Sequence, residues 1–124
     1  MGVVYHTHYL VWCEIGRTDF IRQLGVSYAE LERQGLFLAV AEANIRYAGS
    51  ARYDDPIRVE TWLDAVQSRM ISFRYEIARD DDGAPARLAT ASTKLVALDH
   101  NGAPRAMPAD LLERFRELMA TDAG

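Results

Sequence analysis

The sequence predicts a single α+β domain in which an antiparallel β-sheet curves around one long, apolar helix. Three observations predict this architecture. Residues 5–24 carry apolar side chains at helical spacing, four later segments alternate apolar and polar residues, and an amphipathic helix closes the chain. At 124 residues, the chain has the length of one domain, and it shows no repeat or interdomain linker. We therefore expect residues 1–124 to share one core.

Two helices are expected at the start of the chain. The apolar surface of residues 5–24 is wider than one stripe, which is typical of a helix enclosed on several sides. Gly16 in its middle costs about 1 kcal/mol relative to alanine, so we expect the sheet to approach closely there. After Gly25, Ser27-Tyr28-Ala29-Glu30 predicts a capping box, which begins a short helix that ends at Gly35.

The rest of the chain predicts four strands and a last helix. The strands are expected over residues 37–47, 57–67, 70–79 and 86–98. In the first strand, the odd-numbered residues should share one face, opposite Glu42, Asn44 and Arg46. The aspartates and the glycine of residues 80–83 predict a hairpin between the third and fourth strands. Small side chains on the fourth strand leave room for a helix, and Pro108 begins the last helix.

Charge, hydropathy and cysteine content argue against several classes of partner and location. The net charge of −4 argues against nucleic acid as a partner, and no apolar stretch reaches the roughly 18–20 residues of a membrane span. The single cysteine, Cys13, forms no internal disulfide, and the start of the chain is not basic like a secretory signal. We therefore expect a cytoplasmic protein. One lysine against 13 arginines reflects either genome composition or the binding of phosphorylated ligands.

Residues 2–10 read Gly-Val-Val-Tyr-His-Thr-His-Tyr-Leu and are followed by Trp12, Glu14, Arg17 and Phe20. This segment resembles the signature of the 4-hydroxybenzoyl-CoA thioesterase family, and in particular its bacterial acyl-CoA thioesterase branch with the form G-V-V-Y-H-x-x-Y-L. Residues 52–60 resemble the family's Y-D-D loop. With the order of elements, the resemblance covers nearly the whole chain. It implies a hot-dog fold, with the first strand largely missing, and two protomers that join through the strand after the helices into a homodimer. Such dimers often pair into a homotetramer.

The resemblance also implies hydrolysis of acyl-CoA thioesters to free acid and coenzyme A, at a dimer-interface site with no metal and no cofactor. An attacked thioester carbonyl becomes an oxyanion, which the unpartnered N–H groups of a helix start can stabilise. The implied donor is the backbone of His6, with Tyr5 as the second catalytic candidate. The implied substrate-binding residues are Gly2, Val3, Val4 and Asn44.

The family's catalytic aspartate lies just upstream of the G-V-V-Y-H segment, a position that here precedes Met1. The expected explanation is a misassigned initiation codon, and the alternative is a natural protein without this carboxylate. The mass of the native protein distinguishes the two.

Other side chains have competing interpretations. The His6 side chain orients water or only satisfies bonds at the helix start, and Tyr5 lines the acyl pocket or the core. His8 is expected at the surface, and Glu14 is expected to pair with Arg17 rather than to catalyse. Cys13 lies in an apolar helix, no G-x-S-x-G elbow is present, and the histidines lack zinc-helix spacing. Two other functions stay open: a non-catalytic acyl-CoA-binding dimer, and a hot-dog dehydratase with a histidine and a carboxylate across the dimer.

Overall fold

The computed structural model describes residues 6–48, 56–81 and 84–123, with the side chains of residues 6–8, 80–81, 84–86 and 121–123 outside the described part. Helices α1 (His6–Arg22) and α2 (Tyr28–Arg33) precede four strands, and a last helix ends the chain. These elements are β1 (Phe37–Tyr47), β2 (Ile57–Gln67), β3 (Met70–Asp81), β4 (Ala84–Leu98) and α3 (Ala109–Ala123). The strands form one antiparallel sheet in the order β1-β4-β3-β2. The predicted α+β class is therefore confirmed.

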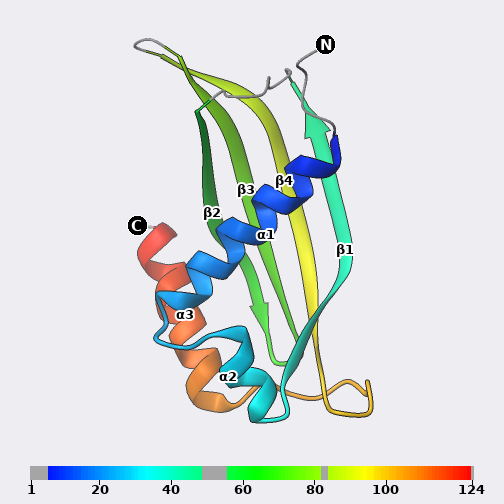
Figure 1. Ribbon diagram of the computed structural model, residues 1–124. Coiled ribbons are helices and arrows are strands. Elements are labelled where there is room, and N and C mark those ends of the chain that lie inside the picture. The colour runs from blue at the N-terminus through cyan, green and yellow to red at the C-terminus, as the bar shows by residue number, and fades with distance from the viewer. Residues whose placement is uncertain (1–5, 49–55, 82–83, 124) are drawn as a thin grey trace.

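Helix α1 runs diagonally across one face of the sheet and lies closest to β2 and β3, while α2 and α3 gather at one end of the sheet (Figure 1). The buried side chains of α1 join those of the central strands in one core. There, the rings of Phe20 and Phe73 meet edge to face, with their centroids 5.6 Å apart. Each large side chain buried there contributes about 1.5–3 kcal/mol. The small residues expected to make room for the helix, Ala89 and Ala91, are buried.

The other side of α1 is exposed. Leu10, Val11 and Ile15 keep 43%, 51% and 55% of their surface accessible. The sequence predicted a helix enclosed on several sides. Within the described residues, only the side facing the sheet is covered, so the prediction is wrong for a single protomer.

Bulges change the predicted faces of the two outer strands. In β1 the register with β4 shifts between Val40 and Glu42, so Leu38 and Ile45 both pack against the core although they lie an odd number of positions, seven, apart. In β2 a similar shift lies between Leu63 and Ala65. Strict alternation over residues 37–47 was therefore wrong, because a bulge inserts one unpaired residue and reverses the side-chain phase.

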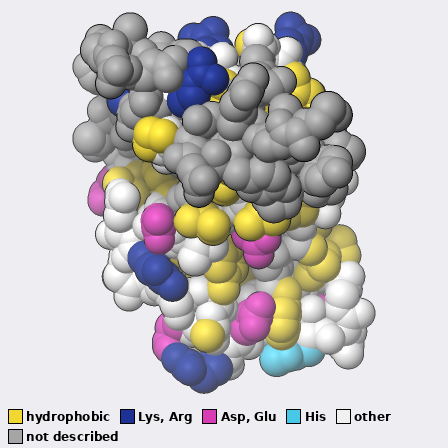
Figure 2. Space-filling model, turned by 45° about the horizontal axis from the view of Figure 1, so that its top comes forward, with side chains coloured by type: hydrophobic (Ala, Val, Ile, Leu, Met, Phe, Trp, Pro, Cys, Tyr) yellow, Lys and Arg dark blue, Asp and Glu magenta, His cyan; other side chains and the backbone are white. Residues whose placement is uncertain are grey.

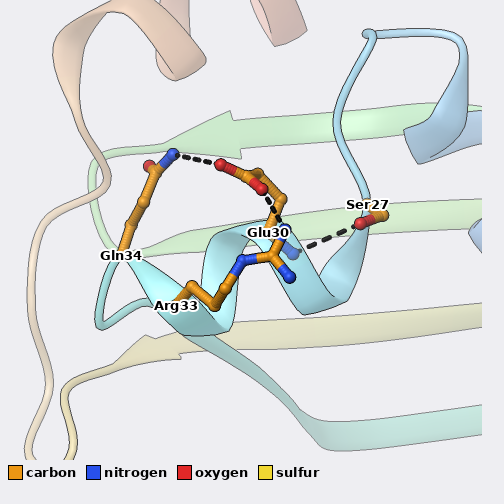
Figure 3. Close-up of polar contacts among 4 residues, drawn as sticks. All are labelled: Ser27, Glu30, Arg33 and Gln34. Carbon is orange, nitrogen blue, oxygen red and sulfur yellow. Dashed lines mark hydrogen bonds and ion pairs between the residues drawn. The ribbon is translucent and has the colours of Figure 1, made fainter.

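Helix α2 begins and ends close to the predicted residues. The Ser27 hydroxyl accepts a hydrogen bond from the Glu30 backbone N–H at 3.2 Å, as a capping box requires. The Glu30 carboxylate, however, contacts Arg33 and accepts from Gln34 Nε2 at 3.4 Å (Figure 3), instead of reaching back to the cap. The hydrogen bond from Arg33 holds the pKa of Glu30 below its usual value. Gly35 follows with φ of +82°, a left-handed conformation that ends the helix.

Gly16 marks a close approach between α1 and β2. A Cβ atom placed on Gly16 would lie 2.5 Å from Thr61 Oγ1 and 3.1 Å from Val59 Cγ1. The close approach expected from the sequence is therefore confirmed. The same hydroxyl, Thr61 Oγ1, is buried without a hydrogen-bond partner among the described residues.

Arg17, the next residue, connects α1 to both α2 and the sheet. Its side chain is only 8% exposed, and it donates from Nε to the Tyr28 hydroxyl at 2.9 Å and from Nη1 to the Tyr75 hydroxyl at 3.2 Å. The Tyr75 hydroxyl also shares a 2.7 Å hydrogen bond with Thr93 Oγ1. Burial raises the pKa of both phenols, although the neighbouring guanidinium opposes this, so both stay protonated at neutral pH. Neutral hydroxyl groups therefore solvate a buried cation.

Replacing Gly16 with alanine should lower the free energy of unfolding by about 1–3 kcal/mol, because overpacking at Thr61 outweighs the helix propensity of alanine. Urea titration measures the change. In a Thr61→Ala background the same substitution should be close to neutral, since the nearest atom is gone. An equal cost in both backgrounds would contradict the contact.

Tyr75→Phe should destabilise the fold by about 1.5–3 kcal/mol, and Tyr28→Phe by about 1 kcal/mol, because only Tyr75 also bonds Thr93. The double variant should cost more than the sum, since it leaves a buried guanidinium without either acceptor. Urea unfolding at pH 7 checks all three variants. Equal effects of the two single substitutions would show that the Thr93 bond contributes nothing.

Candidate functional site

Of the residues predicted for the site around the start of α1, the structure describes the backbone from His6 onward. Helix α1 begins at His6, so the His6 amide is among the first helical N–H groups, which have no carbonyl partner within the helix. The positive end of the helix dipole adds to their attraction for a developing negative charge. The side chain of His6 lies outside the described residues, as do Gly2, Val3, Val4 and Tyr5. Their predicted roles stay predictions.

Aromatic side chains connect the first turns of α1 to the end of β1. Tyr9 is 2% exposed and meets Trp12 at a ring distance of 5.0 Å and Tyr47 at 5.1 Å, edge to face in both cases. Tyr47 is the last residue of β1 and remains half exposed. The start of α1 therefore lies beside the outer edge of the sheet. Sequence reasoning did not select Tyr47, because its only signal was an aromatic residue at a strand end.

A hollow of about 290 Å³ opens between α1 and β2. Its walls are mixed: apolar side chains from both elements are joined by one carboxylate from α1. The lining residues are Trp12, Ile15, Gly16, Asp19, Ile57 and Val59. A second hollow of about 360 Å³ lies on the exposed side of α1, and Glu14 lines it.

Asn44 lies on the opposite face of the sheet from α1. Its strand neighbour Ile45 packs into the core, whereas Asn44 is exposed and donates to Glu42 Oε1 at 3.5 Å. Together with Arg46 of β1, Arg74 of β3 and residues 90–92 of β4, it lines a hollow of about 470 Å³. Within one protomer, the structure therefore does not bring Asn44 together with the start of α1.

The predicted Glu14–Arg17 ion pair is wrong. Arg17 turns toward the tyrosines of the core, while Glu14 is exposed and only its backbone carbonyl is used, by the Thr18 hydroxyl at 2.8 Å. Residues three apart on a helix can meet, but the sheet lies on one side of α1 only. Arg17 points to that side and Glu14 to the other.

Cys13 is not an activated nucleophile. It is 1% exposed, and burial raises the pKa of its thiol to about 11, against the opposing effect of Arg17. The thiolate, which is the reactive form, is therefore scarce at neutral pH. In the described part of the chain, no cluster of histidine, cysteine or acidic residues is arranged to hold a metal ion. No described helix combines the length and apolar character that a bilayer crossing requires.

Comparisons with known proteins identify the family. A family model described as the thioesterase-like superfamily matches residues 1–115. The putative acyl-CoA thioesterase YneP of Bacillus subtilis is 38% identical over 77 residues, which are 62% of this chain and 56% of that protein. The chain thus spans little more than half of that relative. The acyl-CoA thioesterase YbgC of Haemophilus influenzae is 32% identical over 119 residues, covering 94% of this chain and 85% of YbgC.

The fold agrees with this assignment. The crystal structure of a DHNA-CoA thioesterase from Staphylococcus aureus is similar with a TM-score of 0.87 and 31% identity, covering 99% of this chain and 83% of the other. The hot-dog fold implied by the G-V-V-Y-H segment is therefore confirmed. From its sequence match and its fold, the chain belongs to the thioesterase-like superfamily.

Proposed function

We propose that this protein hydrolyses acyl-CoA thioesters to a free acid and coenzyme A in the cytoplasm. Its relatives carry the proposal, because YbgC is named an acyl-CoA thioesterase and YneP a putative one, and similarity to YbgC extends over 94% of this chain. The observation that supports the location of the site is the beginning of α1 at His6, next to the edge of the sheet. Coenzyme A is part of the substrate, and the reaction needs no cofactor.

In the proposed mechanism, the thioester carbonyl oxygen lies against the amide of His6. Hydrolysis turns this oxygen into an oxyanion, and a preorganised N–H group binds the oxyanion more tightly than the ground-state carbonyl. Residues 2–5, which lead into the helix, contact the acyl-CoA. Tyr9 and Trp12 stabilise the first turns of α1, since their rings pack edge to face with their centroids 5.0 Å apart.

A second copy of the chain completes the site. Strand β1 pairs with β4 on one side, and its other edge has no strand partner among the described residues. Antiparallel pairing of two β1 edges extends the sheet across a twofold axis and places residues of one copy beside the Tyr47 end of the other. This arrangement can bring Asn44 near the partner's site.

Attack on the carbonyl also needs a base or a nucleophile. We propose a carboxylate encoded upstream of residue 1, as the resemblance to the 4-hydroxybenzoyl-CoA thioesterase family implies. A non-catalytic acyl-CoA-binding dimer is the second candidate, because the described first turn of α1 contains no acidic residue. A dehydratase is less well supported, since none of the relatives cited above carries that name.

The first test measures thiol release from a panel of acyl-CoA substrates. It uses the 124-residue chain and a version extended upstream in the genomic reading frame. We expect the extended protein to be at least about 100-fold more active, in line with the loss of a catalytic acid–base group. Binding of acyl-CoA without hydrolysis by either protein would replace the proposal with the binding function.

The second test removes one backbone donor. His6→Pro deletes the N–H group at a position where proline is compatible with a helix start, whereas His6→Ala keeps this donor and deletes the side chain. In the active protein, kcat should fall about 10²–10³-fold for proline and less than about 10-fold for alanine. Thermal unfolding and acyl-CoA binding should change little. Similar kcat values for both variants would exclude the amide as the oxyanion donor.

A further inference from the structure

The side of the sheet that faces away from α1 carries a hollow rich in hydrogen-bond donors. Figure 2 shows the molecule from the α1 side, where hydrophobic side chains lie at the surface among acidic and basic ones. On the opposite side, the hollow of about 470 Å³ is bordered by Arg46 of β1, Arg74 of β3, and Thr90 and Ser92 of β4. Because β4 lies between β1 and β3, the two hydroxyl groups lie between the two arginines.

The strand register places these side chains in two adjacent rows. Arg46 is paired with Thr90, and Arg74 is paired with Ser92, two residues further along β4. Neighbouring strands lie about 4.8 Å apart and successive residues of one face about 6.8 Å apart, so the Cα atoms of the two arginines are roughly 12 Å apart. Two long side chains can therefore meet over a small anion that rests on the hydroxyl groups.

These donors are not used within the protomer. The side chains of Arg46, Thr90 and Ser92 make no hydrogen bond or ion pair with other described residues. The guanidinium of Arg74 lies 5.2 Å from the centre of the Trp62 ring. This cation–π contact orients the guanidinium without neutralising its charge.

The nearest carboxylates on the same face already have cationic partners. Glu76 lies 3.5 Å from Arg87 Nη2, and Glu42 lies 3.8 Å from Lys94 Nζ. The Asn44 side chain also donates to Glu42. The two arginines of the hollow are therefore cations without a carboxylate partner among the described residues, which favours an anionic ligand.

We propose that this hollow binds the phosphate group of a small molecule. Arg46 and Arg74 hold the phosphate from two sides, and the hydroxyl groups of Thr90 and Ser92 donate to its oxygens. Arginine suits this role because its planar fork donates paired hydrogen bonds to phosphate oxygens. The excess of arginine over lysine in the chain left phosphorylated ligands as one of two explanations, and this pair of arginines fits that explanation.

Two sources offer the same chemistry: the 3′-phosphate of coenzyme A and a separate phosphorylated metabolite. Only the first source rests on the proposed function, because it requires that acyl-CoA binds the protein. The hollow itself lies on the other side of the sheet from α1, so its binding can be measured without hydrolysis.

Calorimetric titration with inorganic pyrophosphate tests the site in the unmodified protein. Arg46→Ala and Arg74→Ala should each weaken binding at least about 10-fold, and Thr90→Val about 3-fold, because charged donors bind phosphate more strongly than neutral ones. In about 0.15 M salt, Arg116→Ala on α3 is the matched control and should leave Kd within about 2-fold, since distant charges are screened. Circular dichroism checks that each variant keeps its fold.

Trp62 supplies a second signal from the hollow. The chain has two tryptophans, so Trp12→Phe leaves Trp62 as the only one. Pyrophosphate should change the emission of Trp62 in this variant, because it binds the guanidinium that contacts the ring. The change should disappear when Arg74→Ala is added.

Coenzyme A and dephospho-coenzyme A distinguish the two sources. If the 3′-phosphate occupies the hollow, coenzyme A should bind about 10-fold more tightly than the dephospho form, and Arg46→Ala should remove the difference. Pyrophosphate binding without this difference assigns the hollow to a separate phosphorylated ligand. Absence of saturable pyrophosphate binding, or equal weakening by Arg116→Ala, overturns the site and leaves the proposed thioesterase function unaffected.

Discussion

The close contact between α1 and the sheet is the constraint on which the rest of the structure depends. At Gly16 the helix backbone approaches Thr61 so closely that a single Cβ atom would collide with its hydroxyl. One residue later, Arg17 extends into the core and bonds a tyrosine of α2 and a tyrosine of β3. The first contact sets the separation of helix and sheet. The second limits sliding and rotation of the helix, because the guanidinium has directional donors in a nearly dry environment.

This anchoring matters for the site because the chemistry is proposed for backbone groups. An amide at a helix start can be aimed only by placing the whole helix. The aromatic contact between Tyr9 and Tyr47 places the first turns of α1 beside the edge strand β1, while Arg17 holds the helix near its middle. Both contacts are made by side chains of α1. The packing of the core therefore also determines the position of the proposed oxyanion donor at the start of this helix.

Helix α1 also explains why one segment carries so much apolar surface. Tyr9, Cys13 and Ile21 face the sheet and are fully buried, while Leu10, Val11 and Ile15 face away and are about half exposed. The edge of β1 that faces away from β4 has no strand partner among the described residues, and this is the edge through which the proposed dimer would form.

The sequence by itself determined the element order, the boundaries of β1 and β2, the cap at Ser27 and the close approach at Gly16, because propensity, periodicity and capping depend on neighbours along the chain. The hairpin strands β3 and β4 each extend two residues further toward their turn than predicted. The G-V-V-Y-H segment was enough to identify the fold and family. The bulges at Val40 and Leu63 could not be predicted, since they arise where a twisted strand fits its partner. Tertiary structure alone decided that Arg17 bonds Tyr28 and Tyr75 rather than Glu14. A helix pattern shows which residues share a side, but only packing against the sheet decides which side is buried and which partners a buried cation finds there.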